Sequence, residues 1–463
     1  MDKYRKLFSN TAIFAISNVL SKLILSLLLP LYTRVLTTSE YGTTELVTTI
    51  IQLVIPICSL AIQDSIFRFS MEKDRHPADV LRSSGIVVLI ACILLGIVSS
   101  VLFFYEPVHD WILYLWVISV VTMIRSIMSL YIKAIEKTLI FSIDNVIYNL
   151  SLALLNVILL TFFHLKVEGY FIALIFANII SIIFLGISGD FLSQLNSGKN
   201  DRSLLKEMIA YSFPLILNSI SWGITHLIDK VMLTNHIGTS ATGIYSAASK
   251  IPSLLSLVTG VFTQAWALSA ISDYQQEKDR TFYINIFNLT HLGLLVASLT
   301  IFVFNNNFLA FVMGKDFLES VGFVPVLLVG TVFLTYSNFF SPIYSAMKKS
   351  KQIMVSSFVG MIINVLLNLL LIPQLGIMGA CIATSISYIF IGVFRIVDCN
   401  RIFPIDIDYK RFALSILVLI FCCFSATVNK YVFAICGISI VLIIFLYKKN
   451  IQIFLEKIIL CFR

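Results

Sequence analysis

The sequence predicts an all-α, multi-pass membrane protein, and two observations carry that prediction. Of its 463 residues, 58% are hydrophobic and only 13% are charged, and the mean hydropathy is +0.94. No ordinary soluble domain has this balance. Apolar runs of about 20 residues, each long enough to cross a bilayer, recur from one end of the chain to the other.

The runs divide the chain into about 14 transmembrane helices joined by short connections. The N-terminal run lacks an A-x-A cleavage site, and we interpret it as a retained first helix. No connection exceeds about twenty residues, so we expect no sizeable domain outside the membrane. In order, the predicted spans cover about 8–31, 43–66, 83–105, 111–132, 141–163, 169–190, 208–234, 243–268, 283–304, 321–345, 353–372, 377–397, 411–428 and 431–447.

Lys and Arg gather in every second connection, and this alternation predicts orientation. The basic set includes both chain ends and residues such as Arg68, Lys133 and Arg395 at predicted helix ends. By the positive-inside rule, both termini face the cytoplasm of a cell membrane. Because the basic residues alternate with the spans, the net charge of +8 indicates a bilayer partner and no nucleic acid.

An internal repeat predicts the domain organisation. The segment YTRVLTTSEYGTTELV (32–47) resembles IDKVMLTNHIGTSATGIYSAASKI (228–251), so that Gly42 matches Gly243. A second pair of segments aligns Asn156 with Asn368 at a similar offset. Six helices per repeat keep both copies in the same orientation, which predicts two parallel six-helix bundles. The predicted parts are an N-terminal lobe (1–195), a cytoplasmic linker (196–207), a C-terminal lobe (208–402), and two further helices with a cytoplasmic tail (403–463).

Polar residues inside the apolar spans are the candidate site. Tyr211–Gln264 contains Asp229, Lys230 and Lys250, and a polar stripe from Glu45 to Gln63 runs along one face of the predicted second helix. Polar stripes on neighbouring membrane helices predict a wet cavity between the two protein halves, because a lipid-facing surface would not carry them. The polar candidates for lining this cavity or for coupling are Glu45, Gln52, Asp64, Asp144, Asn145, Asn149, Asn218, Asp229 and Gln264.

These residues have a structural and a functional interpretation. Asn, Ser and Thr side chains can simply hold helices together. Lys22, Arg125 and Lys250 each cost about 2.5–3.5 kcal/mol to insert, so they either pair with Asp144 and Asp229 or form an anion site. The buried carboxylates could instead carry a coupling H⁺ or Na⁺.

Motifs for other chemistries are missing from the sequence. The eight cysteines include no CxxC pair, and no GxxxxGK[ST], GxSxG or HExxH motif occurs. We therefore expect no enzyme activity, no bound metal and no cofactor. Transport would then draw its energy from a source other than ATP.

The chain resembles the Wzx-type oligosaccharide flippases of the multidrug/oligosaccharidyl-lipid/polysaccharide exporter superfamily. The resemblance covers nearly the whole chain and rests on the 6+6+2 helix layout and on LPLYTRVLTTSEYGTTELV and IDKVML…GIYSAASKI. It implies a V-shaped pair of lobes with alternating access. The implied substrate is an undecaprenyl-diphosphate-linked oligosaccharide moved to the outer leaflet, and implied partners include polysaccharide polymerase and assembly proteins. The cations that the resemblance implies for diphosphate binding are Lys22, Arg34, Arg125, Lys230 and Lys250.

Three alternatives stay open at this point. A cation-coupled drug exporter of the same superfamily would favour an acidic cavity, and the buried cations and extra helices count against it. A membrane polymerase or ligase would need a large external loop with catalytic residues. A scaffold would tolerate neutralised charges, whereas the flippase hypothesis predicts that Ala at Arg125 or Lys250 abolishes export.

Overall fold

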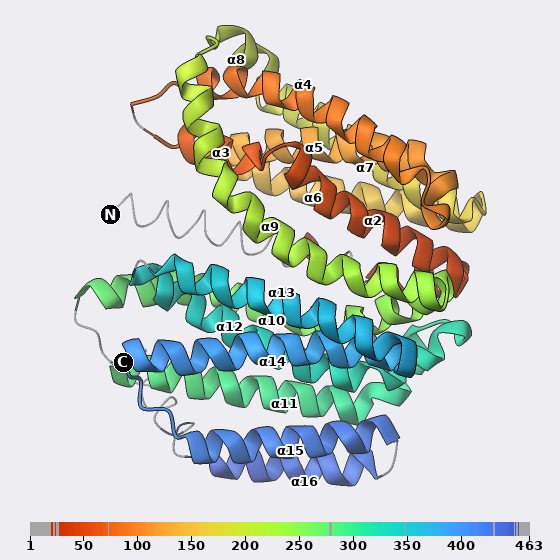
Figure 1. Ribbon diagram of the computed structural model, residues 1–463, viewed down its shortest axis with the longest axis vertical. Coiled ribbons are helices and arrows are strands. Elements are labelled where there is room, and N and C mark those ends of the chain that lie inside the picture. The colour runs from red at the N-terminus through yellow and green to blue at the C-terminus, as the bar shows by residue number, and fades with distance from the viewer. Residues whose placement is uncertain are drawn as a thin grey trace. The chain divides into compact units, whose positions relative to one another are not determined.

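The computed structural model describes residues 20–452, apart from 22–23, 25–26, 73, 277–279, 348, 429–430, 449 and 451. Within these residues every regular element is a helix, so the predicted all-α fold is confirmed (Figure 1). The elements are α2 (Thr38–Cys58), α3 (Ile62–Ser70), α4 (Pro77–Leu102), η1 (Glu106–Trp111), α5 (Ile112–Ala134), α6 (Thr138–Val157), η2 (Ile158–Phe162), α7 (Lys166–Ser188), α8 (Phe191–Ser197), α9 (Arg202–His236), α10 (Thr239–Gln276), α11 (Arg280–Val312), η3 (Lys315–Gly322), α12 (Val324–Ala346), α13 (Ser350–Leu375), α14 (Ile377–Ile402), α15 (Tyr409–Val428) and α16 (Val432–Leu446).

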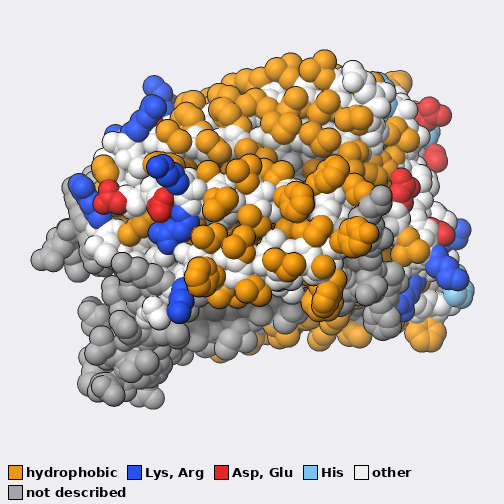
Figure 2. All heavy atoms as spheres, turned by 90° about the horizontal axis from the view of Figure 1, so that it is seen from below, with side chains coloured by type: hydrophobic (Ala, Val, Ile, Leu, Met, Phe, Trp, Pro, Cys, Tyr) orange, Lys and Arg blue, Asp and Glu red, His pale blue; other side chains and the backbone are white. Residues whose placement is uncertain are grey.

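Ten helices in the described part of the chain are long and apolar enough to cross a membrane. The helices α9 and α10, with 35 and 38 residues, also exceed the length of a bilayer core but carry more polar residues. At 15 residues, α16 is shorter. Figure 2 shows a face on which hydrophobic side chains form a broad band with charged side chains toward either end, as expected of a membrane protein.

The chain divides into two compact units, Met1–Gly243 (unit 1) and Ile244–Arg463 (unit 2). In unit 1, α9 packs along α2, although the repeat assigns these helices to different lobes. In unit 2, α14 packs closely on both α12 and α13. The division into two lobes, a linker and two final helices, which rests on the internal repeat, stays a prediction.

The second predicted span, 43–66, is wrong in one respect, because it is two helices and not one. Pro56 lacks a backbone N–H, and α2 ends two residues later. Leu60 and Ala61 then adopt positive φ angles of 52° and 47°, which an α-helix cannot contain. The polar stripe is therefore interrupted, and Asp64 lies on α3, separate from the Glu45 end of α2.

Small residues let the helices of unit 2 approach closely. A Cβ atom at Gly330 would lie 2.7 Å from the Cα atom of Ser385, and one at Gly392 would lie 2.6 Å from the carbonyl oxygen of Phe333. Both contacts join α12 to α14. Close backbone approach replaces the hydrophobic driving force that membrane helices lack among themselves.

The segment between α8 and α9 lies against the start of α4 inside unit 1. The Lys199 backbone N–H donates to Asp79 Oδ1 at 2.6 Å, and Arg82 Nη1 donates to the Leu195 carbonyl oxygen at 2.9 Å. The predicted linker 196–207 is thus anchored to α4 at Lys199, and α8 is anchored to α4 at Leu195, just before the linker.

Candidate functional site: two buried ion pairs in unit 1

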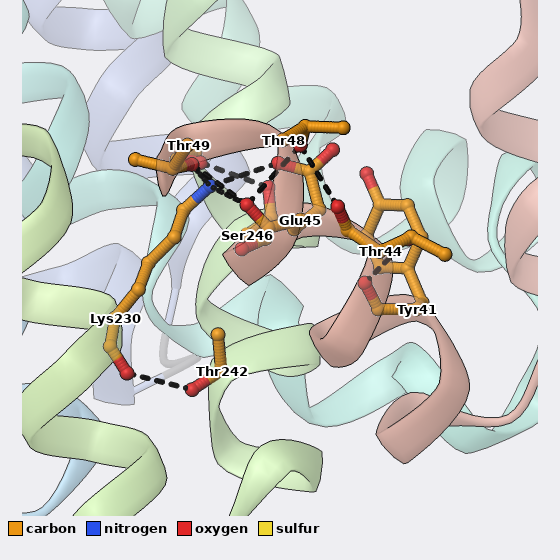
Figure 3. A network of polar contacts seen from close by, with 9 residues as sticks. Tyr41, Thr44, Glu45, Thr48, Thr49, Lys230, Thr242 and Ser246 are labelled. Atoms are coloured by element: carbon orange, nitrogen blue, oxygen red, sulfur yellow. Dashed lines mark hydrogen bonds and ion pairs between the residues drawn. The ribbon is translucent and has the colours of Figure 1, made fainter. Parts of the chain in front are cut away.

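A buried ion pair joins α9 to α2. Lys230 Nζ lies 2.9 Å from Glu45 Oε2, 3.2 Å from the Glu45 carbonyl oxygen and 2.7 Å from Thr49 Oγ1 (Figure 3). Lys230 is 9% exposed and Glu45 is 8% exposed. In the sequence analysis Lys230 is a candidate cation for diphosphate binding, and Glu45 is a candidate for lining the cavity or for coupling. The structure brings the two side chains together.

The local structure explains the geometry of this pair. Glu45 and Thr49 are four residues apart on α2, so their side chains lie one above the other on the same helix face. Opposite them, Thr242 Oγ1 donates to the Lys230 carbonyl oxygen at 3.1 Å and lies 2.8 Å from Thr234 Oγ1. These bonds close the turn between α9 and α10 next to the lysine.

The Lys230 ammonium group contacts as many oxygen atoms of α2 as it has N–H donors. An ammonium group has three N–H donors, and its acceptors on α2 are Glu45 Oε2, the Glu45 carbonyl oxygen and Thr49 Oγ1. A phosphate oxygen that binds Lys230 therefore competes with these oxygen atoms. We expect an anion at this site to weaken the contacts between Lys230 and α2.

Aromatic rings surround the carboxylate side of the pair. The rings of Tyr32 and Tyr41 are stacked with centroids 6.1 Å apart, and Tyr170 approaches Tyr32 edge-on at 5.2 Å. All three side chains are buried. Buried rings exclude water and lower the local dielectric, so the attraction between Lys230 and Glu45 is stronger than on a surface.

A second buried pair lies elsewhere in unit 1, between α5 and α6. Arg125 Nη2 is 3.2 Å from Asp144 Oδ2, and Ser181 donates to the other carboxylate oxygen of Asp144. Arg125 also donates to Ser181 Oγ at 2.7 Å, and its guanidinium carbon lies 3.7 Å from the ring centroid of Tyr148. Asp144 is fully buried, and this closed network favours a structural role for Arg125.

Removing one partner of that network is expected to destabilise the protein. Asp144→Ala leaves a desolvated guanidinium without its carboxylate, at a cost of about 3–5 kcal/mol. The double variant Arg125→Ala/Asp144→Ala removes both charges, so we expect it to recover most of the lost thermal stability in detergent. A double-mutant cycle on the unfolding midpoint measures this coupling.

Transport by the same double variant separates the two interpretations of Arg125. A structural pair predicts that stability and export recover together. If the double variant were stable but inactive, Arg125 would contact substrate and the structural interpretation would fail.

The other predicted residues are distributed over both units. Asp229 is buried on α9 next to Lys230, and Lys250 is half-buried on α10. Arg34 and Gln52 are exposed, and Asp64 is half-buried on α3. Asn149 Nδ2 donates to the Asn145 carbonyl oxygen at 2.6 Å, and Asn145 Oδ1 accepts from Arg125 at 3.5 Å, so both belong to the second pair's surroundings. Lys22 lies outside the described residues, as do the side chains of Asn218 and Gln264.

The charge pattern places Arg395 among the basic residues at the cytoplasmic helix ends, and this placement is wrong. The structure buries its side chain inside unit 2. Its side chain is among the largest fully buried ones, and its five hydrogen bonds all end on neutral oxygens. They go to Ser356 Oγ at 2.9 Å, Ser337 O at 3.1 Å, Ser341 Oγ at 2.8 Å, Ile353 O at 3.1 Å and Ser357 Oγ at 2.9 Å. The apolar residues flanking Arg395 on both sides are the signal that would have indicated burial.

Among the residues that the structure describes, no group of three or more His, Cys, Asp or Glu side chains could hold a metal ion. In the two buried pairs of unit 1, the carboxylates of Asp144 and Glu45 each face a basic side chain.

The fold is that of known membrane transporters. The structure matches the lipid II flippase MurJ in an inward closed conformation with a TM-score of 0.69, at 15% identity over 98% of this chain and 99% of that chain. It also matches an inward-facing multidrug transporter of the MATE family with a TM-score of 0.71, at 15% identity over 84% of this chain and 98% of that one. The match to the flippase thus extends over more of this chain than the match to the multidrug transporter.

Sequence comparison gives the family. An uncharacterized membrane protein of Methanocaldococcus jannaschii is 25% identical over 237 residues, which are 47% of this chain and 46% of that protein. The chain thus spans about half the length of the curated relatives that it matches. Residues 7–267 match the family model of polysaccharide biosynthesis proteins. This match includes both buried ion pairs and more than half of the sequence, and the chain therefore belongs to the polysaccharide biosynthesis protein family.

Proposed function

We propose that this protein is a flippase that moves lipid-linked oligosaccharide from the cytoplasmic to the outer leaflet of the cell membrane. The proposed substrate is an undecaprenyl-diphosphate-linked repeat unit for a surface polysaccharide. In this proposal both termini are cytoplasmic, the lobes alternate in access, and the protein performs no covalent chemistry. Polysaccharide polymerase and assembly proteins would act on the delivered unit.

The observation that carries the proposal is Lys230, a cation 9% exposed within a chain of the polysaccharide biosynthesis family. A buried lysine supplies a compact positive charge that suits a diphosphate. Its present partner, Glu45, occupies the place of the anion. Lys250, Arg34 and Lys22 are proposed as further cations along the route, and coupling to H⁺ or Na⁺ through Glu45, Asp64 or Asp229 is part of the proposal.

The drug-exporter alternative receives less support. Cationic drugs need an uncompensated carboxylate, whereas Glu45 and Asp144 each face a cation in the structure. The resemblance to drug exporters covers only the two predicted six-helix bundles. The final helices α15 and α16 lie beyond these bundles.

Lys230→Ala is expected to lower export by roughly tenfold to a hundredfold, because a charge-assisted contact is worth about 1.5–3 kcal/mol. The test uses a host in which this gene is deleted and complemented. A membrane-impermeant sugar-modifying reagent then reports which leaflet holds the lipid-linked sugar. Accumulation on the cytoplasmic leaflet is the expected outcome for the variant.

Two further variants make that experiment specific. Lys315→Ala, which changes an exposed lysine in η3, should export normally. Glu45→Ala/Lys230→Ala removes both charges and should insert and fold yet remain inactive. Normal leaflet distribution of the sugar in the deletion strain, together with altered sensitivity to cationic dyes, would reject the flippase and favour the drug exporter.

A further inference from the structure

Within unit 1, the first turn of α2 crosses the first turn of α10 at an unusually short distance. A Cβ atom at Gly42 would overlap the carbonyl oxygen of Thr239 and lie 2.8 Å from the backbone nitrogen of Gly243. A Cβ atom at Gly243 would in turn overlap the carbonyl oxygen of Thr38. The contact is reciprocal, and only glycine fits at either position.

Hydroxyl groups join the same two turns. Thr38 Oγ1 lies 2.6 Å from Ser240 Oγ, and Ser39 Oγ lies 2.6 Å from Thr239 Oγ1. Each helix begins with Thr-Ser and has glycine as its fifth residue, so equivalent positions of the repeat contact each other crosswise. This is the self-complementary pattern of a two-fold interface, built here within one chain. We call these six residues the glycine crossing.

The glycine crossing is connected to the Lys230 site from both helices. On α2, Glu45 lies three residues beyond Gly42 and therefore on the same side of the helix. On α10, Thr242 precedes Gly243 and donates to the Lys230 carbonyl oxygen. The ion pair therefore holds α9 to α2, and the crossing holds the start of α10 to α2, less than one helical turn away along α2.

The α2 end of the crossing is fixed in unit 1. Thr37 and Glu40 form a capping box, in which the Thr37 backbone N–H donates to Glu40 Oε2 at 2.8 Å. The other carboxylate oxygen of Glu40 lies 2.9 Å from Lys166 Nζ at the start of α7. The first turn of α2 is thus tied to α7, whereas small hydroxyl groups and the Lys230–Glu45 pair hold it to α9 and the start of α10.

We propose that the glycine crossing and the Lys230–Glu45 pair form one latch, which an anionic diphosphate headgroup opens by taking Lys230 from Glu45. This inference rests on the proposed function. Since Lys230 Nζ contacts three oxygen atoms of α2, a bound diphosphate competes with α2 for this lysine. The crossing then keeps only two hydroxyl pairs and backbone packing, which separate at low cost. Substrate binding and opening of this helix end are thereby linked.

Disulfide cross-linking tests the latch in the full-length protein. The eight native cysteines are replaced by alanine, and Thr38→Cys and Ser240→Cys are introduced together as the crossing pair. The 2.6 Å separation of the two native hydroxyl oxygens brings the Cβ atoms within disulfide range. The rate of disulfide formation with copper-phenanthroline is measured in proteoliposomes, with and without undecaprenyl diphosphate. We expect undecaprenyl diphosphate to slow it at least about fivefold, the lower range of a binding-linked change.

Matched variants show whether the effect passes through the ion pair. Glu45→Gln should slow cross-linking without any added lipid, and Lys230→Met should make the rate insensitive to undecaprenyl diphosphate. The control pair Thr234→Cys/Thr242→Cys joins α9 to the start of α10, where the native hydroxyl oxygens are 2.8 Å apart, and its rate should stay constant. Undecaprenol, which lacks the diphosphate, should have no effect.

Each contrary result has a defined meaning. If radiolabelled undecaprenyl diphosphate binds but leaves the cross-linking rate of the crossing pair unchanged, the latch is wrong and the flippase proposal stands. If undecaprenol slows the reaction equally, the diphosphate is not the trigger and the latch is again overturned. If undecaprenyl diphosphate does not bind at all, both the proposed function and the latch fail.

Discussion

Arg395→Ala is expected to lower the thermal unfolding midpoint in detergent by roughly 3–5 °C. The five hydrogen bonds of Arg395 tie α14 to α12, through Ser337 and Ser341, and to α13, through Ile353, Ser356 and Ser357. Hydrogen bonds between membrane helices average only about 0.6 kcal/mol each. The five bonds and the space left by a large buried side chain together give about 3–5 kcal/mol. Because the unfolding entropy grows with chain length, a protein of 463 residues loses only about 1 °C per kcal/mol.

The size of the shift in unfolding midpoint depends on the residue that replaces Arg395. Arg395→Met fills most of the space and removes the cost of burying a charge, so we expect a smaller shift than for alanine. Arg395→Lys keeps the charge but has three donors in place of five, which leaves acceptors unfilled. Arg401→Ala, an exposed arginine on the same helix, is the matched control. Equal midpoints for the Ala variants at 395 and 401 would show that the network contributes no stability.

Gly42→Ala is expected to disrupt the glycine crossing and to lower export at least about fivefold. The added methyl group meets the backbone of Thr239 and Gly243, which cannot rotate away as a side chain would. The two helices must therefore separate, and overpacking of this kind costs about 1–3 kcal/mol, which is about fivefold to 150-fold in an equilibrium constant. Export is the first measurement, and the cross-linking rate of the Thr38→Cys/Ser240→Cys pair is the second.

The reciprocal geometry adds a sharper expectation for the second glycine. Gly243→Ala should have a similar effect, and the double variant should be little worse than either single one, because both break the same contact. Gly85→Ala, in α4, adds a methyl group with no atom within 4 Å and should leave export unchanged. Additive effects of Gly42→Ala and Gly243→Ala would indicate two independent sites and contradict a single crossing.

The fold class follows directly from the sequence. Hydropathy and run length are local properties, so α4, α7 and α14 can be recognised as membrane helices without knowing their neighbours. The break after α2 could also have been anticipated from Pro56, although the positive φ angles at Leu60 and Ala61 could not. The predicted spans 208–234 and 243–268 lie within α9 and α10, whose full lengths were not predicted.

The identity of the buried charges was also evident from the sequence, because a charged side chain within or at the end of an apolar run is rare and costly. Lys230, Glu45, Arg125 and Asp144 were all singled out in this way. What each charge contacts was not evident. Arg395 was misplaced altogether, since a positive residue near a predicted helix end fits the positive-inside rule equally well whether it is buried or exposed.

Composition and spacing by themselves therefore determined that this is an all-helical membrane protein with charges inside its spans and a repeated Thr-Ser…Gly segment. Only the tertiary structure decided that Lys230 pairs with Glu45, 185 residues away, that Arg125 pairs with Asp144, and that the two glycines of the repeat pack on each other. The reason is physical: helical periodicity gives the face on which a side chain lies, but the partner depends on which helix packs against that face. That choice is made by long-range packing among many similar apolar surfaces.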